Sequence, residues 1–243
     1  MRVLGVIPAR LASTRLPRKV LREIAGMPMV IHVWRRAQRC PELASALVAT
    51  DSEEVVAACR AHGAPAVMTS AAHRSGTDRM WEVAQSHPAD VYVNIQGDEP
   101  LLSPRHIEGL VVPFLADPTV QVTTLKIRAT AEEARSPNVN KVVTTVGGDA
   151  LYFSRNPIPY DRDGAGEVVY WKHVGLYAFR RNALETFHRL PPSSLERAEN
   201  LEQLRLLEHG IPIRVTETDE PTIGVDTEED LQAVEARLRP AAR

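Results

Sequence analysis

The stretch Val3-Leu4-Gly5-Val6-Ile7-Pro8-Ala9-Arg10 decides the fold class of this 243-residue chain. Its first five residues form a short, continuous apolar run, which is the pattern of a β-strand covered on both faces. Strands of this kind are typical of parallel sheets with a layer of helices on each side. The stretch therefore predicts an α/β fold if strands and helices alternate farther along the chain.

Strand-like and helix-like segments do alternate over about the first hundred residues, as a βαβ architecture requires. This order predicts an α/β fold with a mostly parallel twisted sheet and helices on both faces. After the first strand, the expected elements are strands at residues 47–50, 66–68 and 91–95 and helices at 29–39, 51–63 and 77–85.

The second half of the chain is less regular and predicts a small antiparallel subregion. Gly147-Gly148-Asp149 separates two strand-like segments, 141–146 and 150–154, as expected of a hairpin. Thr227 and Asp230 have the spacing of a capping box that opens a last helix. The other expected elements are strands at residues 121–127, 173–179 and 213–218 and one amphipathic helix at 195–208.

Composition and charge exclude several classes of protein. The net charge of −2 argues against a nucleic-acid-binding protein that works through a general basic surface. No apolar run approaches the ~20 residues that a membrane span needs, and the N-terminus lacks the organisation of a signal peptide. Cys40 and Cys59 form neither a disulfide framework nor a metal motif. We therefore expect a cytoplasmic protein without nucleic-acid or membrane partners.

A cluster of basic residues follows the first strand. Arg10, Arg15, Arg18 and Lys19 lie within ten residues, together with Ser13. Ligands of open parallel sheets bind beyond the carboxyl ends of the strands, and guanidinium and ammonium groups bind phosphate oxygens. The loop therefore predicts an anion site, although a solvated basic loop would have the same composition. It is neither a Walker loop nor a GxGxxG dinucleotide turn.

Two aspartates are candidates for binding a metal ion. Asp98 follows the strand at 91–95 and Gly97, so its carboxylate is expected at the ligand-binding edge of the sheet. Asp226 lies just before the last helix, where capping that helix is the alternative role. Because Mg²⁺ prefers carboxylate, water and phosphate oxygens, the two side chains together would suit a metal–triphosphate complex.

Seven motifs carry a resemblance to a known family: residues 7–17, 75–79, 96–100, 150–155, 172–177, 201–205 and 224–227. In this order and spacing they resemble the cytidylyltransferases that form CMP-sugars, and most of all the 3-deoxy-manno-octulosonate (Kdo) cytidylyltransferase family. The resemblance implies that CMP passes from CTP to an acidic acceptor, most of all Kdo, with release of pyrophosphate. It also implies a homodimer that uses one or two Mg²⁺ ions.

The resemblance further implies one domain of the nucleotide-sugar transferase type, Rossmann-like, over residues 1–243. Within it, residues 1–120 would bind CTP, 121–220 would serve acceptor binding and dimerisation, and 221–243 would supply a metal aspartate and the closing helix.

Individual roles also follow from the resemblance. Lys19, Arg10, Asp98 and Asp226 are implied as catalytic, and the two aspartates as the metal ligands. Arg18 stands where the family pattern has glycine, and Val20 where proline is frequent, so Arg18 receives no role. The implied CTP ligands are Pro8, Ala9, Arg10, Ser13, Arg15, Lys19, His73, Arg74, Ser75, Gly76 and Arg79, and the implied acceptor ligands are Gln96, Arg155, Arg162, His173, Tyr177, Glu202 and Gln203.

Simpler alternatives stand beside these roles. Thr77 and Asp78 also suit a helix cap, and His173 taken alone suits a core or surface histidine.

Arginines that bind a carboxylate also bind a phosphonate, so the acceptor could be a sialic acid or a small phosphonate such as phosphonoformate. A non-catalytic nucleotide sensor on this fold would be expected to lack Lys19 or a metal aspartate. A Rossmann dehydrogenase would need the glycine fingerprint that the first strand lacks.

Overall fold

The computed structural model describes residues 1–13, 16–73, 75–164, 166 and 168–238. The chain divides into two compact units, Met1–Glu108 with Thr222–Arg243 and Gly109–Pro221. The first unit thus contains both ends of the chain. The division of a single domain at residues 120 and 220 stays a prediction.

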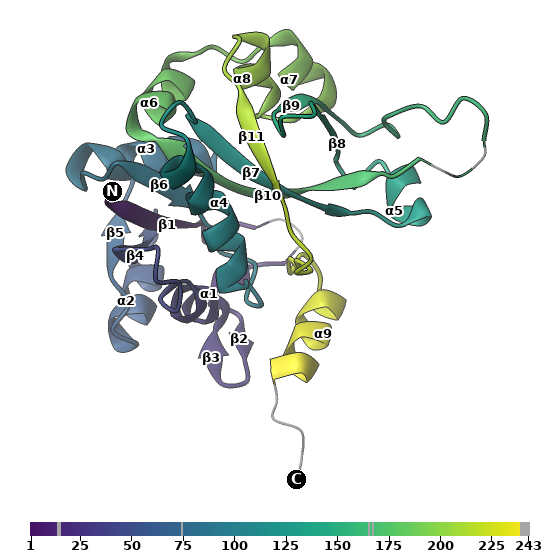
Figure 1. The fold of residues 1–243 in the computed structure, drawn as a ribbon. Helices are drawn as coiled ribbons and strands as arrows, with labels where there is room; N and C mark the ends of the chain where they lie inside the picture. Colours follow the sequence, from purple (N-terminus) through teal and green to yellow (C-terminus); the bar gives the residue numbers. More distant parts are fainter. Residues whose placement is uncertain (14–15, 74, 165, 167, 239–243) are drawn as a thin grey trace. The chain divides into compact units, whose positions relative to one another are not determined.

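The first unit is built on a parallel sheet of four strands in the order β6-β1-β4-β5 (Figure 1). In β1, every residue of the apolar run is buried, as a strand covered on both faces requires. The sheet confirms the parallel order expected from the alternating pattern of the sequence. The strands are β1 (Val3–Ala9), β4 (Ser45–Thr50), β5 (Ala66–Met68) and β6 (Val91–Asn94).

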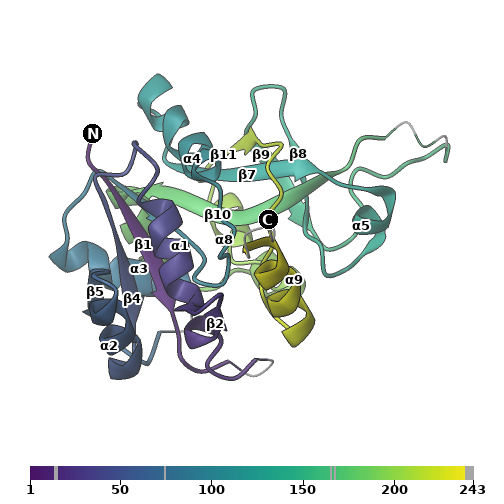
Figure 2. The same cartoon turned by 90° about the horizontal axis from the view of Figure 1, so that it is seen from below.

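Helices cover both faces of this sheet. Figure 2 shows α1 and α3 on opposite sides of β1, and α2 packs beside β4 and β5. Right-handed crossovers in a parallel sheet produce this arrangement when the chain reverses direction along the sheet. The helices beside the sheet are α1 (Met29–Ala37), α2 (Glu53–Ala61) and α3 (Gly76–Ser86). The unit also contains helix α9 (Glu228–Leu238), a short 3₁₀ helix η1 (Lys19–Leu21) and a hairpin of β2 (Glu23–Ile24) and β3 (Met27–Pro28).

A buried apolar cluster joins the loop after β1 to the end of the chain. Leu16, Ile24 and Met29 pack in one cluster with Val225 and α9 side chains. All of these side chains are at most 5% exposed, so the cluster excludes water. It anchors the basic loop at Leu16, together with the residues that follow the loop, and holds the segment before α9 in the same cluster. The α9 members of the cluster are Leu231 and Val234.

The second unit has a mixed sheet. Strand β7 pairs antiparallel with β10 and parallel with β11, and β8 pairs antiparallel with β10. The predicted hairpin is confirmed, because β8 and β9 are antiparallel neighbours. Together with the parallel sheet, this confirms the predicted α/β class with an antiparallel subregion. The strands are β7 (Val122–Arg128), β8 (Lys141–Thr144), β9 (Ala150–Ser154), β10 (Trp171–Arg180) and β11 (Ile213–Glu217).

One predicted helix is wrong. Residues 195–208 form two helices, α7 (Ser194–Glu199) and α8 (Leu204–Glu208), separated at Asn200. Asn200 has a φ of 52°, in the left-handed region that asparagine tolerates and that ends helices. The amide of Leu201 then donates to the carbonyl of Glu196, which closes the end of α7. Of the apolar side chains in this stretch, Leu201 between the helices and Leu204 and Leu206 in α8 are buried, whereas Leu195 in α7 is exposed. The apolar pattern therefore held only for the second piece.

Three helices were not predicted: α4 (Pro104–Ala116), α5 (Ala131–Arg135) and α6 (Arg181–Arg189). In α4, Pro113 stands inside the helix, where proline normally interrupts one. Helix α5 is only five residues long and is held by a capping box of Thr130 and Glu133.

The second unit also contains a fully buried lysine, Lys141 on β8. Its ammonium donates to the backbone carbonyls of Ser136 (2.8 Å), Val139 (2.6 Å) and Arg155. Burial lowers the pKa of Lys141. Three carbonyl acceptors compensate the desolvated charge and bind the segment before β8 to the end of β9.

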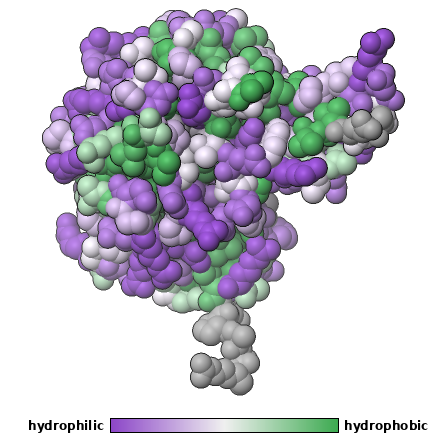
Figure 3. Space-filling view, in the orientation of Figure 1, coloured by the Kyte–Doolittle hydropathy of each residue, from purple (hydrophilic) through white to green (hydrophobic). Residues whose placement is uncertain are grey.

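Hydrophilic side chains cover most of the face seen in Figure 3, and hydrophobic ones lie in separate groups. None of the helices within the described part of the chain combines the length and apolar character needed to cross a membrane. The exposed large apolar side chains include Val112, Leu115, Val146, Leu151, Tyr160 and Val169.

Candidate active site

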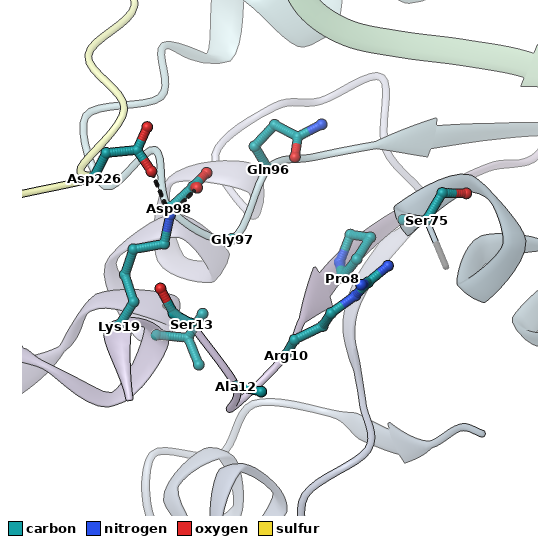
Figure 4. A pocket seen from close by; sticks show the side chains of 12 residues that line it. Pro8, Arg10, Ala12, Ser13, Lys19, Ser75, Gln96, Gly97, Asp98 and Asp226 are labelled. Atoms are coloured by element: carbon teal, nitrogen blue, oxygen red, sulfur yellow. Dashed lines mark hydrogen bonds and ion pairs between the residues drawn. The ribbon is translucent and has the colours of Figure 1, made fainter. Parts of the chain in front are cut away.

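A pocket of about 470 Å³ lies in the first unit, at the carboxyl ends of β1 and β6. This is the edge of a parallel sheet at which ligands bind. Four segments line it: the loop after β1, the start of α3, the segment after β6, and the residue before the last capping box (Figure 4). The lining residues are Pro8, Arg10, Ala12, Ser13, Lys19, Val20, Ser75, Gly76, Gln96, Gly97, Asp98 and Asp226.

The two strand ends approach each other so closely that only glycine fits at position 97. A Cβ atom on Gly97 would lie 2.7 Å from the carbonyl oxygen of Pro8, a backbone atom that cannot move without shifting β1. The close approach places Pro8 and Asp98 in the same pocket.

We expect Gly97→Ala to lower the free energy of unfolding by about 1–3 kcal/mol because the extra methyl overpacks the contact. The backbone would have to shift at this contact, and that shift would also displace Asp98. Thermal unfolding and an assay of CMP transfer measure the two effects. Gly224→Ala is the matched control, because a Cβ there meets no atom within 4 Å and the residue lies in the same unit. Equal stability and activity of the two variants would contradict the close-packing argument.

Lys19 joins the two candidate metal ligands. Its Nζ lies 2.6 Å from Oδ2 of Asp98 and 3.0 Å from Oδ1 of Asp226 (Figure 4). The Lys19 side chain is 14% exposed, against 31% for Asp98 and 42% for Asp226. Partial burial opposes the charged form of the lysine, but the attraction of Asp98 and Asp226 outweighs it and raises the pKa of Lys19. Two carboxylates therefore share one ammonium.

A backbone contact explains why residues from distant parts of the chain meet here. The amide of Val225 donates to the carbonyl of Asp98 at 2.9 Å, so Asp226 necessarily follows beside Asp98. The predicted capping box is confirmed, because Thr227 and Asp230 exchange hydrogen bonds at the start of α9. The cap of α9 is therefore not the Asp226 carboxylate, which binds Lys19 instead.

The opposite side of the pocket provides donors for an anion. Figure 4 shows Arg10 and Ser75 across from Lys19. Within the described ranges, the Arg10 guanidinium forms no hydrogen bond or ion pair, so its donors remain available to a ligand. Ser75 is the N-cap of α3: its Oγ accepts from the amide of Asp78 at 3.1 Å, and its hydroxyl donates to the Asp78 carboxylate at 3.0 Å. The positive end of the helix dipole at Gly76 adds a favourable field for phosphate.

Arg18 does not line this pocket, and its backbone shows why the family pattern has glycine at this position. Its φ is 57°, so the position has the left-handed backbone that glycine normally supplies. The Arg18 guanidinium pairs with Glu54 on the exposed surface. The loop thus keeps its left-handed turn, and an exposed ion pair of about 0–1 kcal/mol partly offsets the strain.

A metal ion would find suitable donors at Asp98 and Asp226. Among the described residues, no three His, Cys, Asp or Glu side chains gather in one group. Mg²⁺ does not need such a group, because it is commonly held by one or two carboxylates together with substrate phosphates. The neighbouring Glu99 is unlike them: burial and the charge of Asp98 raise its pKa to about 8. Asp98 and Asp226, which share the Lys19 ammonium, are thus the two carboxylates that fit a magnesium–triphosphate complex.

Three of the predicted CTP ligands lie outside the pocket lining. Arg79 is fully buried, and its guanidinium binds Asp51 at 2.8 Å and the hydroxyl of Thr69. His73 pairs with Glu82, and Ala9 is buried at the end of β1. Their contact with CTP stays a prediction. Two further predicted ligands, Arg15 and Arg74, fall outside the described residues.

Of the predicted acceptor ligands, Gln96 lines the pocket and the others belong to the second unit. The Arg155 guanidinium is already engaged, because it donates to the carbonyls of Glu199 (2.7 Å), Pro137 (3.1 Å) and Asn200 (3.3 Å). Arg155 therefore ties the end of β9 to the break between α7 and α8. Its contact with an acceptor stays a prediction, as do those of Arg162 and Glu202, which are not buried.

The remaining acceptor candidates form a buried polar group in the second unit. Nε2 of His173 lies 2.9 Å from Oγ1 of Thr124, and its ring packs against Tyr177. Burial and the charge of Glu202 raise the pKa of the Tyr177 hydroxyl. Gln203 is 7% exposed, and its Nε2 has no hydrogen-bond partner among the described residues. The buried hydroxyl of Tyr177 also has no hydrogen-bond partner among the described residues. Because unsatisfied buried polar groups are costly, Gln203 and Tyr177 are the best placed of these candidates to bind a ligand.

The buried histidine predicts a dependence of stability on pH. Burial lowers the pKa of His173 to about 3, whereas an unfolded histidine has a pKa of about 6.5. Below pH 6.5 the unfolded chain therefore binds the extra proton, and stability is lost as the pH falls toward the folded-state pKa. Between pH 7 and 5 this histidine alone should cost about 2 kcal/mol.

His173→Gln should remove this contribution while retaining a polar group for Thr124. Urea unfolding of both proteins at pH 7 and pH 5 measures the difference. An equal loss of stability in the two proteins would show that His173 is not the titrating group.

Reasoning from the sequence gave no role to two pocket residues, Ala12 and Gly97, which line the site without a reactive side chain. Outside the pocket, it also missed the ion pair of Arg18 with Glu54, which is distant in sequence. Only Gly97 carried a usable signal, since a glycine directly after a buried strand indicates a close backbone approach.

Comparisons with known proteins identify the family of this chain. A family described as cytidylyltransferase matches residues 4–216. A 3-deoxy-manno-octulosonate cytidylyltransferase of Acidobacterium capsulatum is 59% identical, over 98% of this chain and 97% of its own. The enzyme of the same name from Koribacter versatilis is 55% identical, over 98% and 91%.

A solved structure supports the same relationship. It is described as CMP:2-keto-3-deoxy-manno-octonic acid synthetase complexed with CTP, and it is 47% identical to this chain. The two structures superpose with a TM-score of 0.95 over 98% of each chain. Sequence and fold thus agree, and the chain belongs to the cytidylyltransferase family, among the 3-deoxy-manno-octulosonate cytidylyltransferases.

Proposed function

We propose that this protein transfers CMP from CTP to Kdo and releases pyrophosphate. The observation that carries the proposal is the pocket at the ends of β1 and β6, where Lys19 binds both Asp98 and Asp226 and faces the donors of Arg10. A triphosphate needs such a set of positive groups, and a metal ion needs the two carboxylates. The solved relative with CTP supports the choice of nucleotide.

In the proposed reaction, a hydroxyl oxygen of the acceptor attacks the α-phosphorus of CTP. The bond from that phosphorus to the bridging oxygen of the β-phosphate breaks, the hydroxyl proton is released, and pyrophosphate leaves. Such a transfer depends mainly on alignment and on stabilisation of the charge that develops on the phosphate oxygens. Arg10 and Lys19 would supply that charge, and Ser13 would donate to a phosphate oxygen.

We also propose that Asp98 and Asp226 hold Mg²⁺. When bound, the ion would neutralise phosphate charge and favour loss of the proton from the attacking hydroxyl. The two aspartates supply the hard oxygen donors that Mg²⁺ prefers. Their common bond to Lys19 supports the assignment, because it shows that both carboxylates face the same cation.

The names of the relatives support Kdo as the acceptor over a sialic acid or a phosphonate. Gln96, which lines the pocket, is the acceptor ligand proposed in the first unit. A non-catalytic sensor would be expected to lack one of Lys19, Asp98 and Asp226, and all three are present in the pocket.

A panel of acids tests the proposal. The protein is mixed with CTP and Mg²⁺ and with Kdo, a sialic acid or phosphonoformate, and pyrophosphate release is measured. We expect turnover with Kdo far above that with the other acids. No turnover with Kdo, alongside turnover with another acid, would refute the acceptor and leave the transfer reaction in place.

The resemblance also leads us to propose a homodimer in the cytoplasm. Exposed apolar side chains on the second unit, such as Leu151, Tyr160 and Val169, support a partner surface there. Sedimentation equilibrium should give twice the mass of one chain, and a single-chain mass at micromolar concentration would refute the dimer.

A further inference from the structure

We propose that Lys19 competes with the divalent cation for Asp98 and Asp226, so that the protein binds the metal well only when CTP draws the lysine away. This inference rests on the proposed function, because it takes the two aspartates as the metal ligands. It adds a second role to Lys19: besides binding phosphate, the side chain controls when the carboxylates become available.

The contacts of Lys19 carry the argument. Its Nζ binds one oxygen of Asp98 at 2.6 Å and one of Asp226 at 3.0 Å. A metal ion bound by both carboxylates needs oxygens on the same side of the pair, where the ammonium lies. An ammonium and a divalent cation between the same two carboxylates would repel each other and compete for the oxygens of Asp98 and Asp226 that now bind Lys19. Binding of the metal to both aspartates therefore requires displacement of Lys19.

The charges explain why CTP would favour the exchange. One ammonium leaves a pair of carboxylates with a net charge of −1, whereas a divalent cation neutralises the pair. The displaced ammonium would lie uncompensated in a pocket that also contains Arg10. A triphosphate supplies the negative charge that Lys19 needs after it leaves the aspartates. Metal and CTP therefore favour each other's binding through Lys19 as well as by direct contact.

The backbone allows this exchange without a change of fold. Lys19 opens the short helix η1, and the next residue, Val20, is buried and holds the backbone in place. The lysine has a flexible stem of four carbons, so its ammonium can move while its Cα stays fixed. Lys19, Asp98 and Asp226 all belong to one compact unit. Only a side-chain rotation is required.

Binding of Mn²⁺ in the absence of nucleotide tests the proposal directly. Electron paramagnetic resonance of free Mn²⁺ gives the dissociation constant without any need for activity. We expect weak binding by the unaltered protein and binding at least about tenfold tighter by Lys19→Gln, in the range typical of coupling between sites. Lys19→Arg keeps the charge and should bind as weakly as the unaltered protein. Lys19→Met, also neutral, serves as a second test if Lys19→Gln does not fold.

Arg22→Gln is the matched control for the loss of one positive charge. Arg22 lies on the same loop but pairs with Glu228, so its variant should not tighten Mn²⁺ binding. Equal affinities of Lys19→Gln and Arg22→Gln, or tight binding by Lys19→Arg, would overturn the competition.

A separate measurement identifies failure of the underlying proposal. Mn²⁺ binding in the presence of CTP should fall strongly in Asp98→Asn and Asp226→Asn. If Mn²⁺ binding does not fall in these variants, Asp98 and Asp226 are not the metal ligands, and the proposed competition is refuted as well. If it falls but Lys19→Gln does not tighten nucleotide-free binding, the metal ligands stand and only the competition is refuted.

Discussion

Replacement of Asp98 or Asp226 by asparagine is expected to lower the turnover of CMP transfer by about 10³-fold, because a metal ion contributes several kcal/mol to stabilisation of the developing charge. Each substitution removes one negative charge and keeps an oxygen that can accept a hydrogen bond from Lys19. The fold should therefore survive while the affinity for the metal is lost. Pyrophosphate release with CTP, Mg²⁺ and Kdo measures the effect.

Glu228→Gln is the control for these two variants. Glu228 lies two residues after Asp226 but pairs with Arg22 at the surface, so turnover should stay near that of the unaltered protein. Thermal unfolding checks that all three variants are folded. Unchanged turnover in both aspartate variants would refute their roles as metal ligands.

Lys141→Met is expected to give the largest loss of stability, about 3 kcal/mol or more. Methionine has a similar length but donates no hydrogen bond, so the carbonyls of Ser136, Val139 and Arg155 would lose a common charged donor inside the protein. Each buried acceptor without a partner costs the free energy of its desolvation. Urea unfolding followed by circular dichroism measures the loss.

Lys172→Met provides a closely matched comparison. Lys172 is the register partner of Lys141 across β10 and β8. Its ammonium pairs with Glu133 at 2.6 Å in a half-exposed setting, where such a pair is worth about 0–1 kcal/mol. If the two variants lose the same stability, the three carbonyl contacts of Lys141 are not what stabilises this region.

The sequence alone was sufficient for the parallel half of the fold. Strand β5 was predicted at the residues where it occurs, and β1, β4 and β6 within a few residues. These strands are buried on both faces, so their apolar runs are continuous and easily recognised. By contrast, the break at Asn200 depends on one residue adopting a left-handed backbone, which an apolar pattern does not reveal. Helix α4 contains Pro113, which local rules read as an interruption.

The meeting of Arg10 and Asp98 in one pocket was also predictable, for a related reason. Residues at the carboxyl ends of parallel strands meet at one edge, so Arg10 and Asp98 were expected near each other. What the sequence did not show was the ion pairing of Lys19 with both aspartates. It also did not show that the Arg155 guanidinium is bound by three backbone carbonyls. Hydrogen bonds between distant segments depend on tertiary packing and leave no local pattern.

The proposed site is tested most directly by a crystal structure of this protein with CTP and Mg²⁺. We expect the triphosphate to lie in the pocket at the ends of β1 and β6, in contact with Arg10, Ser13 and Lys19. Asp98 and Asp226 should then bind the metal, and the Lys19 ammonium should have moved from the aspartates to the phosphates. A triphosphate bound elsewhere, or a metal that neither aspartate contacts, would contradict the proposed roles of these residues.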